Sequence, residues 1–391
     1  MAVRHGYGKV AGTDALVFAY DTGDTRNSYK GEPTENLITN PIPTSTTGFS
    51  RSGGTGAKTY DSEKQAVYWE QTAYATWGAY FNFFPAFTGT LDVNSQYTFS
   101  VEYYNQSDFA ETGINYNLVQ GNGQSGATYY NNITPKVVEI GGGWKRFTHT
   151  FIPANSGVSA AYNRFIVGNK GTDVLRMWFR NIQFEKKSHK TPFTAGTRSV
   201  SGSLLDLTGN SSVNLTNMSF DSNAQMTFDG TSDYINFPAG TMPNFGTDDF
   251  AIEVVFKMTK SSSYSHFYQV KDQYYFALKM SNGDQRIYVY RTSALSTYSS
   301  IAADTTLGAW HHLVCQRNGD NIEMYLNGDY KGSKSGWNTI DIDGDTYDTI
   351  IGKYNNEYSQ GDQPVTKVYN RALTAGEVKN NYSHYKNRFG I

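Results

Sequence analysis

The sequence is poor in cysteine, in charge and in long apolar runs. Its single cysteine, Cys315, cannot form a disulfide within the chain, which is typical of a protein that folds in a reducing cytoplasm. No apolar run reaches the roughly 18 residues that a membrane-spanning helix needs. The first ten residues lack the apolar stretch of a signal peptide. We therefore expect a protein made in the cytoplasm, without membrane insertion, that works outside a cell only if it leaves by a route other than ordinary secretion.

Charge is both scarce and balanced. The 33 Lys and Arg residues face 35 Asp and Glu residues, a formal net charge of −2, and charged residues make up 17% of the chain. An average soluble domain has about 25%. A nucleic acid or an anionic membrane surface would attract a basic surplus, and the sequence has none. We expect neither partner.

Glycine and aromatic residues take the place of the missing charge. The chain holds 38 Gly, 30 Tyr and 23 Phe, a composition that favours strands over helices. Segments in which apolar and polar residues mostly alternate recur about every dozen residues, and this period of two is typical of half-buried antiparallel strands. Three Asn-Gly pairs, at 282–283, 318–319 and 327–328, can supply the two positive φ angles of a type I′ hairpin turn. The clearest of these segments are 15–20, 97–103, 146–152, 175–184, 250–257, 286–290, 310–316 and 321–326.

One helix is predicted, at the C-terminal end. Thr374 and Glu377 form the capping-box pattern that starts a helix. Val378, Tyr382, Tyr385 and Phe389 then follow at spacings of four, three and four, which gives one apolar stripe. We expect this stripe to close one end of a sandwich.

Motifs in residues 200–391 resemble those of laminin-G-like, concanavalin A-like jelly rolls. The resemblance implies a β-sandwich whose relatives include lectins and glucanases. The motifs that carry it are Met226–Phe237, Asp249–Lys257, Trp310–Val314, Met324–Asp329 and Val368–Val378.

An inserted domain is predicted between two polar, Pro- and Gly-containing linkers, 30–35 and 187–199. Ala15–Tyr29 resembles the first strand of jelly rolls in tailed-phage virion proteins, which normally continues through a short loop into a Leu-Thr-Gly-Asn element. That element, within Leu205–Asn210, comes here only after the insertion. Long insertions add little loop-closure entropy.

The predicted fold is therefore all-β, with two β-sandwich (jelly-roll) domains, one inserted in the other, and a short C-terminal helix. The first domain is discontinuous and takes residues 1–34 and 199–391. The second takes residues 35–198 and resembles, less specifically, a carbohydrate-binding-module jelly roll. Its motifs are Tyr97–Tyr103, Gly141–Phe147 and Phe179–Glu185.

Two groups of aromatic residues are candidate glycan contacts, because aromatic rings stack on the apolar faces of pyranoses. A core or subunit-interface role is the alternative, since Tyr buries much area at low entropy cost, and a Tyr surplus favours a homo-oligomer. Trp144, Trp178 and Trp310 are assigned to the core. The candidates are Trp69, Tyr74, Trp77, Tyr80, Tyr129 and Tyr130 in the inserted domain, and Tyr264, Tyr268, Tyr274, Tyr275, Trp337 and Tyr358 in the first.

A short acidic segment is a candidate calcium site. Asp341, Asp343, Asp345 and Asp348 could supply the oxygen ligands that this cation prefers. The spacing is not that of an EF-hand, because Gly344 falls at the fourth position and Gly352 stands at the twelfth. A solvated hairpin turn is the alternative. No other cofactor is expected.

Catalytic patterns are weak. Many relatives of the resembled fold hydrolyse β-glucans with an E-x-D-x-x-E strand, and no glutamate here has an aspartate two residues further on. No Ser/His/Asp or Cys/His set has a supporting context. We expect no catalytic residues and no enzyme.

Taken together, these features predict a non-enzymatic structural protein of a bacteriophage virion, either a tail appendage or fibre or a capsid decoration protein. It would bind other virion proteins and host surface polysaccharide. Two alternatives are open. One is a glycan depolymerase of a phage tail, and the other is a purely architectural protein with no ligand beyond its neighbours.

Overall fold

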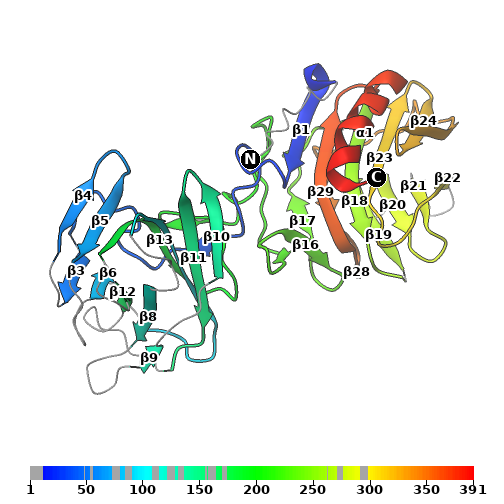
Figure 1. Cartoon of the computed structure of the whole chain (residues 1–391). Helices are drawn as coiled ribbons and strands as arrows, with labels where there is room; N and C mark the ends of the chain where they lie inside the picture. The colour runs from blue at the N-terminus through cyan, green and yellow to red at the C-terminus, as the bar shows by residue number, and fades with distance from the viewer. Residues whose placement is uncertain are drawn as a thin grey trace. The chain divides into compact units, whose positions relative to one another are not determined.

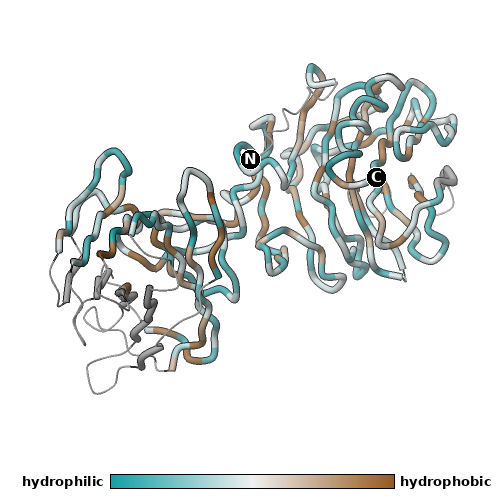
Figure 2. The backbone as a smooth tube through the Cα atoms, in the orientation of Figure 1, coloured by the Kyte–Doolittle hydropathy of each residue, from teal (hydrophilic) through white to brown (hydrophobic). Residues whose placement is uncertain are grey.

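The structure of the chain is a computed structural model, drawn in Figure 1. Its regular secondary structure in the described residues is almost all β-strand, with one α-helix at the C-terminal end, so the predicted fold class is confirmed. Along the coloured part of the backbone in Figure 2, hydropathy changes every few residues, and no long apolar segment stands out there. The structure describes residues 12–47, 49–52, 56–72, 80–83, 90–107, 114–120, 128–130, 136–154, 156, 164–169, 174–261, 263–270, 276–290 and 298–391.

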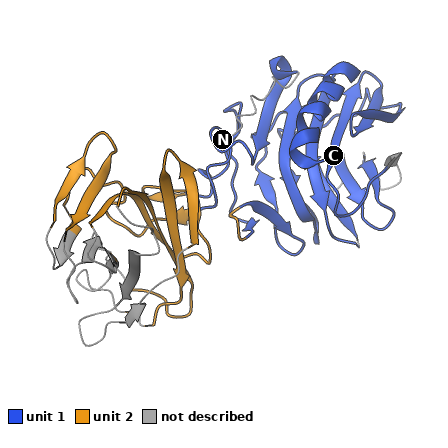
Figure 3. Ribbon diagram, viewed as in Figure 1, with its two compact units in different colours: residues 1–33, 199–221, 225–391 blue, residues 34–198, 222–224 orange. Residues whose placement is uncertain are grey.

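The chain divides into two compact units (Figure 3). Unit 1 takes Met1–Pro33, Ser199–Asp221 and Gln225–Ile391, and unit 2 takes Thr34–Arg198 and Ser222–Ala224. The main breaks, at 33/34 and 198/199, lie within one residue of the boundaries expected from the linkers.

In each unit, the segment where the chain leaves and the segment where it returns lie side by side. In unit 2, β2 (Thr34–Glu35) pairs antiparallel with β14 (Thr197–Arg198). In unit 1, Tyr29 forms an isolated bridge with Leu204. A domain can be inserted into another without disturbing it when its ends lie together in this way.

Unit 1 is a sandwich of two antiparallel sheets, with the short hairpin of β27 (Lys353–Tyr354) and β28 (Glu357–Tyr358) beside them and a 3-10 turn, η1 (Thr13–Ala15), before β1. The first sheet runs β15 (Ser219–Phe220), β16 (Met226–Asp229), β29 (Gln360–Tyr369), β18 (Phe250–Met258), β23 (His311–Asn318), β24 (Asn321–Leu326) and β25 (Asp329–Lys334), with β1 (Leu16–Asp21) also paired to β29. The second sheet runs β17 (Ile235–Phe237), β26 (Thr349–Ile351), β19 (Tyr264–Val270), β20 (Phe276–Ser281), β21 (Arg286–Tyr290) and β22 (Tyr298–Asp304).

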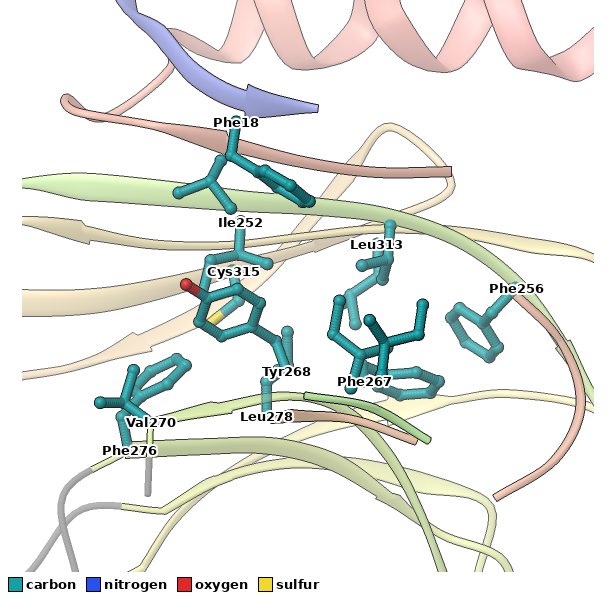
Figure 4. Close-up of a cluster of buried hydrophobic side chains, with 14 of the residues drawn as sticks. Phe18, Ile252, Phe256, Phe267, Tyr268, Val270, Phe276, Leu278, Leu313 and Cys315 are labelled. Atoms are coloured by element: carbon teal, nitrogen blue, oxygen red, sulfur yellow. The ribbon is translucent and has the colours of Figure 1, made fainter. Parts of the chain in front are cut away.

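The core of unit 1 lies between these two sheets. Figure 4 shows Ile252 and Leu313 of the first sheet facing Tyr268 and Leu278 of the second. Cys315 belongs to the same cluster, and burial raises the pKa of its thiol. The thiol is therefore a packing group in this fold.

The C-terminal helix α1 (Ala375–Phe389) has the predicted capping box: Thr374 accepts a hydrogen bond from the backbone N–H of Glu377, and Glu377 accepts one from the backbone N–H of Thr374. The expectation that its apolar stripe closes one end of the sandwich is wrong. Val378 packs in one cluster with Ala251 of β18 and Val314 of β23. The helix therefore lies across the outer face of the first sheet, where those central strands would otherwise expose apolar side chains (Figure 1).

A buried polar cluster lies under this helix. The Glu253 carboxylate is 2.8 Å from His312 Nε2 and 3.7 Å from Lys367 Nζ, and accepts hydrogen bonds from Tyr369 and Asn381. Burial alone would raise the pKa of Glu253, but Lys367 and His312 outweigh it and hold the pKa at about 2. A buried charge persists only with such partners, so this cluster ties α1 to the sheet.

Unit 2 is a second sandwich. Its larger sheet runs β10 (Lys136–Gly141), β11 (Trp144–Phe151), β7 (Tyr97–Asn105), β13 (Leu175–Glu185), β5 (Ala66–Gln71) and β4 (Lys58–Asp61). The other runs β3 (Phe49–Ser52), β6 (Tyr80–Phe83), β12 (Arg164–Asn169), β8 (Ile114–Gln120) and β9 (Thr128–Tyr130). Trp69, Phe99 and Phe179 are among the side chains of its core.

Candidate functional site

The outer face of the second sheet of unit 1 carries polar and aromatic side chains on adjacent strands. In β20, Phe276, Leu278 and Met280 are buried in the core, so Ala277, Lys279 and Ser281 point away from it. In β21, Ile287 and Val289 are buried, so Tyr288 and Tyr290 point outward beside them. Because Lys279 lies opposite Tyr288 and Ala277 lies opposite Tyr290, these outward side chains share one surface.

A lysine lies between two tyrosines on this surface. Lys279 Nζ is 3.6 Å from the ring centroid of Tyr264 and 4.2 Å from that of Tyr290. We call this trio the first lysine sandwich. An ammonium group at such distances from two ring faces is held by cation–π attraction. Burial lowers the pKa of Lys279, which shows that its ammonium is partly desolvated.

The β27–β28 hairpin contributes a second trio of the same kind. Lys353 Nζ is 4.5 Å from the ring centroid of Tyr234 and 5.1 Å from that of Tyr358. We call it the second lysine sandwich. Nearby, Lys260 Nζ donates to the backbone carbonyls of Gly230 and Tyr358, which holds the hairpin against the end of β18.

The two sandwiches are joined by His266 and Glu357. His266 lies opposite Lys279 across β19 and β20, and its Nε2 is 3.3 Å from Glu357 Oε2. Tyr354 packs on the His266 ring at 5.7 Å between centroids. The hydrogen bond with His266 holds the pKa of Glu357 at about 2, and burial lowers the pKa of His266. The ionised Glu357 carboxylate therefore accepts from His266, whose charged form is disfavoured by burial. The Tyr–Lys face is defined as the two sandwiches with His266 and Glu357.

The structure brings two of the candidate glycan residues to this face, Tyr264 and Tyr358. Three others lie in the hydrophobic cores: Trp69 is 1% exposed, and Tyr268 and Trp337 are 0% exposed. A ring enclosed by core side chains has no face for a sugar, so for these three the glycan role is wrong. In β6 and β9, which contain Tyr80, Tyr129 and Tyr130, only the backbone is described. Trp77, Tyr74, Tyr274 and Tyr275 lie outside the described residues.

Sequence reasoning missed six members of the Tyr–Lys face: Tyr234, His266, Lys279, Tyr290, Lys353 and Glu357. One signal for Tyr290 was present, because the alternation in 286–290 places Tyr288 and Tyr290 on the same side of one strand. The lysines gave no such signal, because their contacts depend on strand pairing. Lys279 meets its tyrosines across β19–β20 and β20–β21, and Lys353 lies opposite Tyr358 in the β27–β28 hairpin.

The candidate calcium ligands do not form a common site. Asp343 accepts from the backbone N–H of Asp345 and Thr346, which is a local turn. Asp345 accepts from Asn244, and Asp348 accepts from Asn236 and the backbone N–H of Ala239. Asp341 is exposed at the other end of the segment. Among the described residues, no three His, Cys, Asp or Glu side chains gather as metal ligands do.

The outer face of the larger sheet in unit 2 carries an aromatic row. Trp144, Tyr104, Trp178 and Tyr68 lie opposite one another on four adjacent strands. Trp144 and Trp178, each 9% exposed, are buried as predicted and form a small cluster apart from the main core of unit 2. Arg180 lies 3.8 Å from the Trp144 ring and pairs with a glutamate of β7, so this row is covered. Trp310, also assigned to the core, is only partly buried in unit 1 and packs on Phe389 of α1.

Comparison with known proteins identifies the fold of unit 1. Residues 229–379 match the family described as the concanavalin A-like lectin/glucanases superfamily, in its laminin-G form. The jelly roll expected from the sequence motifs is therefore confirmed, and unit 1 is a lectin/glucanase-like β-sandwich. No curated protein sequence matches the chain. No helix in the described part of the chain has the length and apolarity needed to cross a membrane.

Several solved structures are similar to part of the chain. They include the Trypanosoma rangeli sialidase in complex with the inhibitor DANA (15% identity, 46% of this chain and 30% of that chain, TM-score 0.37). Others are the binding domain of Paraclostridial Mosquitocidal Protein 1 (18%, 46% and 49%, 0.38) and the botulinum neurotoxin serotype D ligand binding domain in complex with N-acetylneuraminic acid (14%, 48% and 49%, 0.38). The chain thus spans 30% to 49% of these chains, and a likeness at this level gives no information about what unit 1 binds.

Proposed function

We propose that this protein is a non-enzymatic structural protein of a tailed-phage virion, and that it binds host surface glycans through the Tyr–Lys face of unit 1. The observation that carries the glycan part is the pair of lysine sandwiches, one on the outer face of the second sheet and one at the adjoining β27–β28 hairpin. The core of unit 1 is complete without them, because Phe276, Leu278 and Ile287 already fill the inner side of the same strands.

The residue types on this face suit a sugar ligand. Tyr264, Tyr290, Tyr234 and Tyr358 are each only partly buried, and such rings offer flat apolar area with a hydroxyl at the edge. Ionised Glu357 accepts from Ser263 at 2.7 Å and adds a charged acceptor for sugar hydroxyls. Small-molecule sites commonly combine apolar rings with a few well-placed polar groups. The lectin-like fold of unit 1 agrees with this assignment by analogy.

A binding role fits the charge state of the face better than catalysis. Glycoside hydrolysis needs one carboxylic acid that stays protonated near neutral pH beside a second carboxylate. The hydrogen bond with His266 holds the pKa of Glu357 at about 2, so it is no general acid. The buried Glu253 also has a pKa of about 2 and lies under α1. Neither glutamate can therefore act as the protonated carboxylic acid that a glucanase needs.

The virion role rests on the resemblance of Ala15–Tyr29 to the first strand of phage jelly rolls and on the nesting of two sandwiches. In this role the protein assembles with other virion proteins, forms a homo-oligomer, and sits on the tail or the capsid. Repetition of the face around a symmetric particle multiplies a modest single-site affinity, because linked sites bind at high effective concentration. Calcium at the Asp341–Asp348 segment is not part of this proposal.

A glycan-array screen of the purified protein tests the proposal. We expect binding to one class of surface polysaccharide, and we expect it to be lost in the double variant Tyr264→Ala/Tyr358→Ala. The matched control is Tyr330→Ala, because Tyr330 is a 53% exposed tyrosine on β25 of the first sheet. If a folded sample binds no glycan on the array, the result contradicts glycan binding and favours a purely architectural role. Release of shortened sugars from a bound glycan contradicts the non-enzymatic role and favours a depolymerase.

A further inference from the structure

The two sandwiched lysines each lie between two tyrosine rings and have no carboxylate of the described residues close to the ammonium. Among the described residues, no carboxylate oxygen lies within 4.0 Å of the Nζ atom of Lys279 or of Lys353. Lys257 is the instructive contrast. It also lies over an aromatic ring, Trp310 at 4.8 Å, but its Nζ is 3.0 Å from Asp362. Lys386 lies over a single ring, Tyr382 at 5.9 Å, so a second flanking ring is what Lys279 and Lys353 have in common.

The charge around the sandwiches is unbalanced. Lys279 and Lys353 lie at this face with Lys260 beside it, whereas its carboxylates are Glu357, whose charge acts on Lys279, and Asp284, which accepts from Tyr288. Glu357 is itself engaged, because it accepts from Ser263 and His266. Burial lowers the pKa of Lys279, so the fold bears a cost to keep this ammonium in place. A bound anion would offset that cost.

The position of the tyrosines also determines where the sugar ring of an acidic ligand would lie. Each ammonium is flanked by two tyrosine rings, Tyr264 and Tyr290 for Lys279, and Tyr234 and Tyr358 for Lys353. An acidic group that reaches the ammonium therefore places the pyranose that carries it against a ring. A charge-assisted hydrogen bond beside an aromatic ring that excludes water is stronger than the same bond in bulk water.

We propose that the Tyr–Lys face recognises acidic glycans, with Lys279 and Lys353 each binding a carboxylate or sulfate group of a sugar whose ring contacts the flanking tyrosines. This inference rests on the proposed glycan-binding function and narrows it to a chemical class. Glu357 opposes it, because its negative charge repels the same anionic group. The face therefore contains both the groups that favour an acidic sugar and one that sets a limit on its affinity.

The test uses the full chain and a library of paired oligosaccharides, in which each acidic member, a uronate, a sialate or a sulfate ester, is matched by its carboxyl-reduced or desulfated form. Binding is measured by isothermal titration. We expect the acidic member of a pair to bind at least tenfold more tightly than its neutral form. Lys279→Met and Lys353→Met should each weaken the acidic member about tenfold, the loss of one charge-assisted contact, and leave the neutral form within twofold. Raising the salt from about 50 to 500 mM should weaken only the acidic member.

Two further variants make the result specific. Glu357→Gln should tighten binding of the acidic member severalfold, whereas a role limited to accepting sugar hydroxyls predicts weaker binding. Lys257→Met, the lysine already paired with Asp362, should change nothing. Equal binding of both members of every pair overturns this inference and leaves glycan binding standing. Binding of neither member of any pair overturns both. Comparison of the uronate and sialate pairs with the sulfate pairs shows whether the face binds a carboxylate or a sulfate group.

Discussion

The polar cluster under α1 gives a prediction that can be worked out from the structure. Glu253→Ala removes a carboxylate with 0% exposure and leaves Lys367, at 5% exposure, without its ion-pair partner and with only the more distant charge of Asp21. Breaking a buried ion pair from one side typically costs about 3–5 kcal/mol. Lowering of the Glu253 pKa from 4.5 to about 2 gives a similar figure, about 3 kcal/mol, from linkage. We expect Glu253→Ala to lower the free energy of unfolding of unit 1 by about 3–4 kcal/mol.

Differential scanning calorimetry of the full chain is the assay, because two units give two transitions and only that of unit 1 should move. Glu253→Met/Lys367→Met is the control. It removes both charges at once, so it should recover most of the loss. A loss below about 1 kcal/mol in Glu253→Ala, or a double variant as unstable as the single one, would refute the reasoning.

The same cluster predicts an acid effect with a definite sign. A depressed carboxyl pKa stabilises the folded state above pH 4.5, and that contribution is lost as the pH falls from about 4.5 toward about 2. The stability difference between wild type and Glu253→Gln should therefore shrink over this window. A second expectation concerns the helix start: Thr374→Ala removes the capping box and should cost unit 1 about 1 kcal/mol, measured by the same scans, whereas an unchanged transition would mean the cap is unimportant. A third concerns the β24–β25 turn, where Gly328 has φ +80° and an added Cβ would lie 2.7 Å from the Tyr382 ring, so Gly328→Ala should lower the unit 1 transition and Gly283→Ala, with open space around it, should not.

Most strands could be predicted because their two faces differ. The segment 286–290 alternates polar and apolar residues, and β21 has the same bounds in the structure. The helix was predictable for a similar reason, since its cap and stripe are both local signals. What it packs on was not, because the apolar outer face of the first sheet is formed by strands distant in sequence.

The Asn-Gly turns show the limit of local signals. At Asn327–Gly328 both φ angles are positive, +53° and +80°, as a type I′ turn requires. At 282–283 the loop is longer, because Ser281 pairs with Arg286, and the positive φ of +55° falls on Gln285 instead. Loop length, set by the register of the flanking strands, decides which residue takes the left-handed conformation.

Tyr264 and Tyr268 show why only a few residues of the Tyr–Lys face could be predicted. In a regular strand, residues four apart share a face, so the two tyrosines form one group in the sequence. A register shift between His266 and Tyr268 places an extra residue in β19. Tyr264 therefore lies outward opposite Ser281, while Tyr268 turns into the core opposite Leu278. A bulge of this kind depends on the neighbouring strand, and a periodic pattern contains no sign of it.

The most direct test of the central claim is amide hydrogen exchange of the full chain with and without a glycan that binds it. The account predicts slower exchange on binding in 264–270, 276–290 and 353–358, the strands that carry the Tyr–Lys face. It predicts no change in β23 and β24, which lie in the other sheet. Protection confined to unit 2, or absent from all three segments while the glycan is bound, would contradict it.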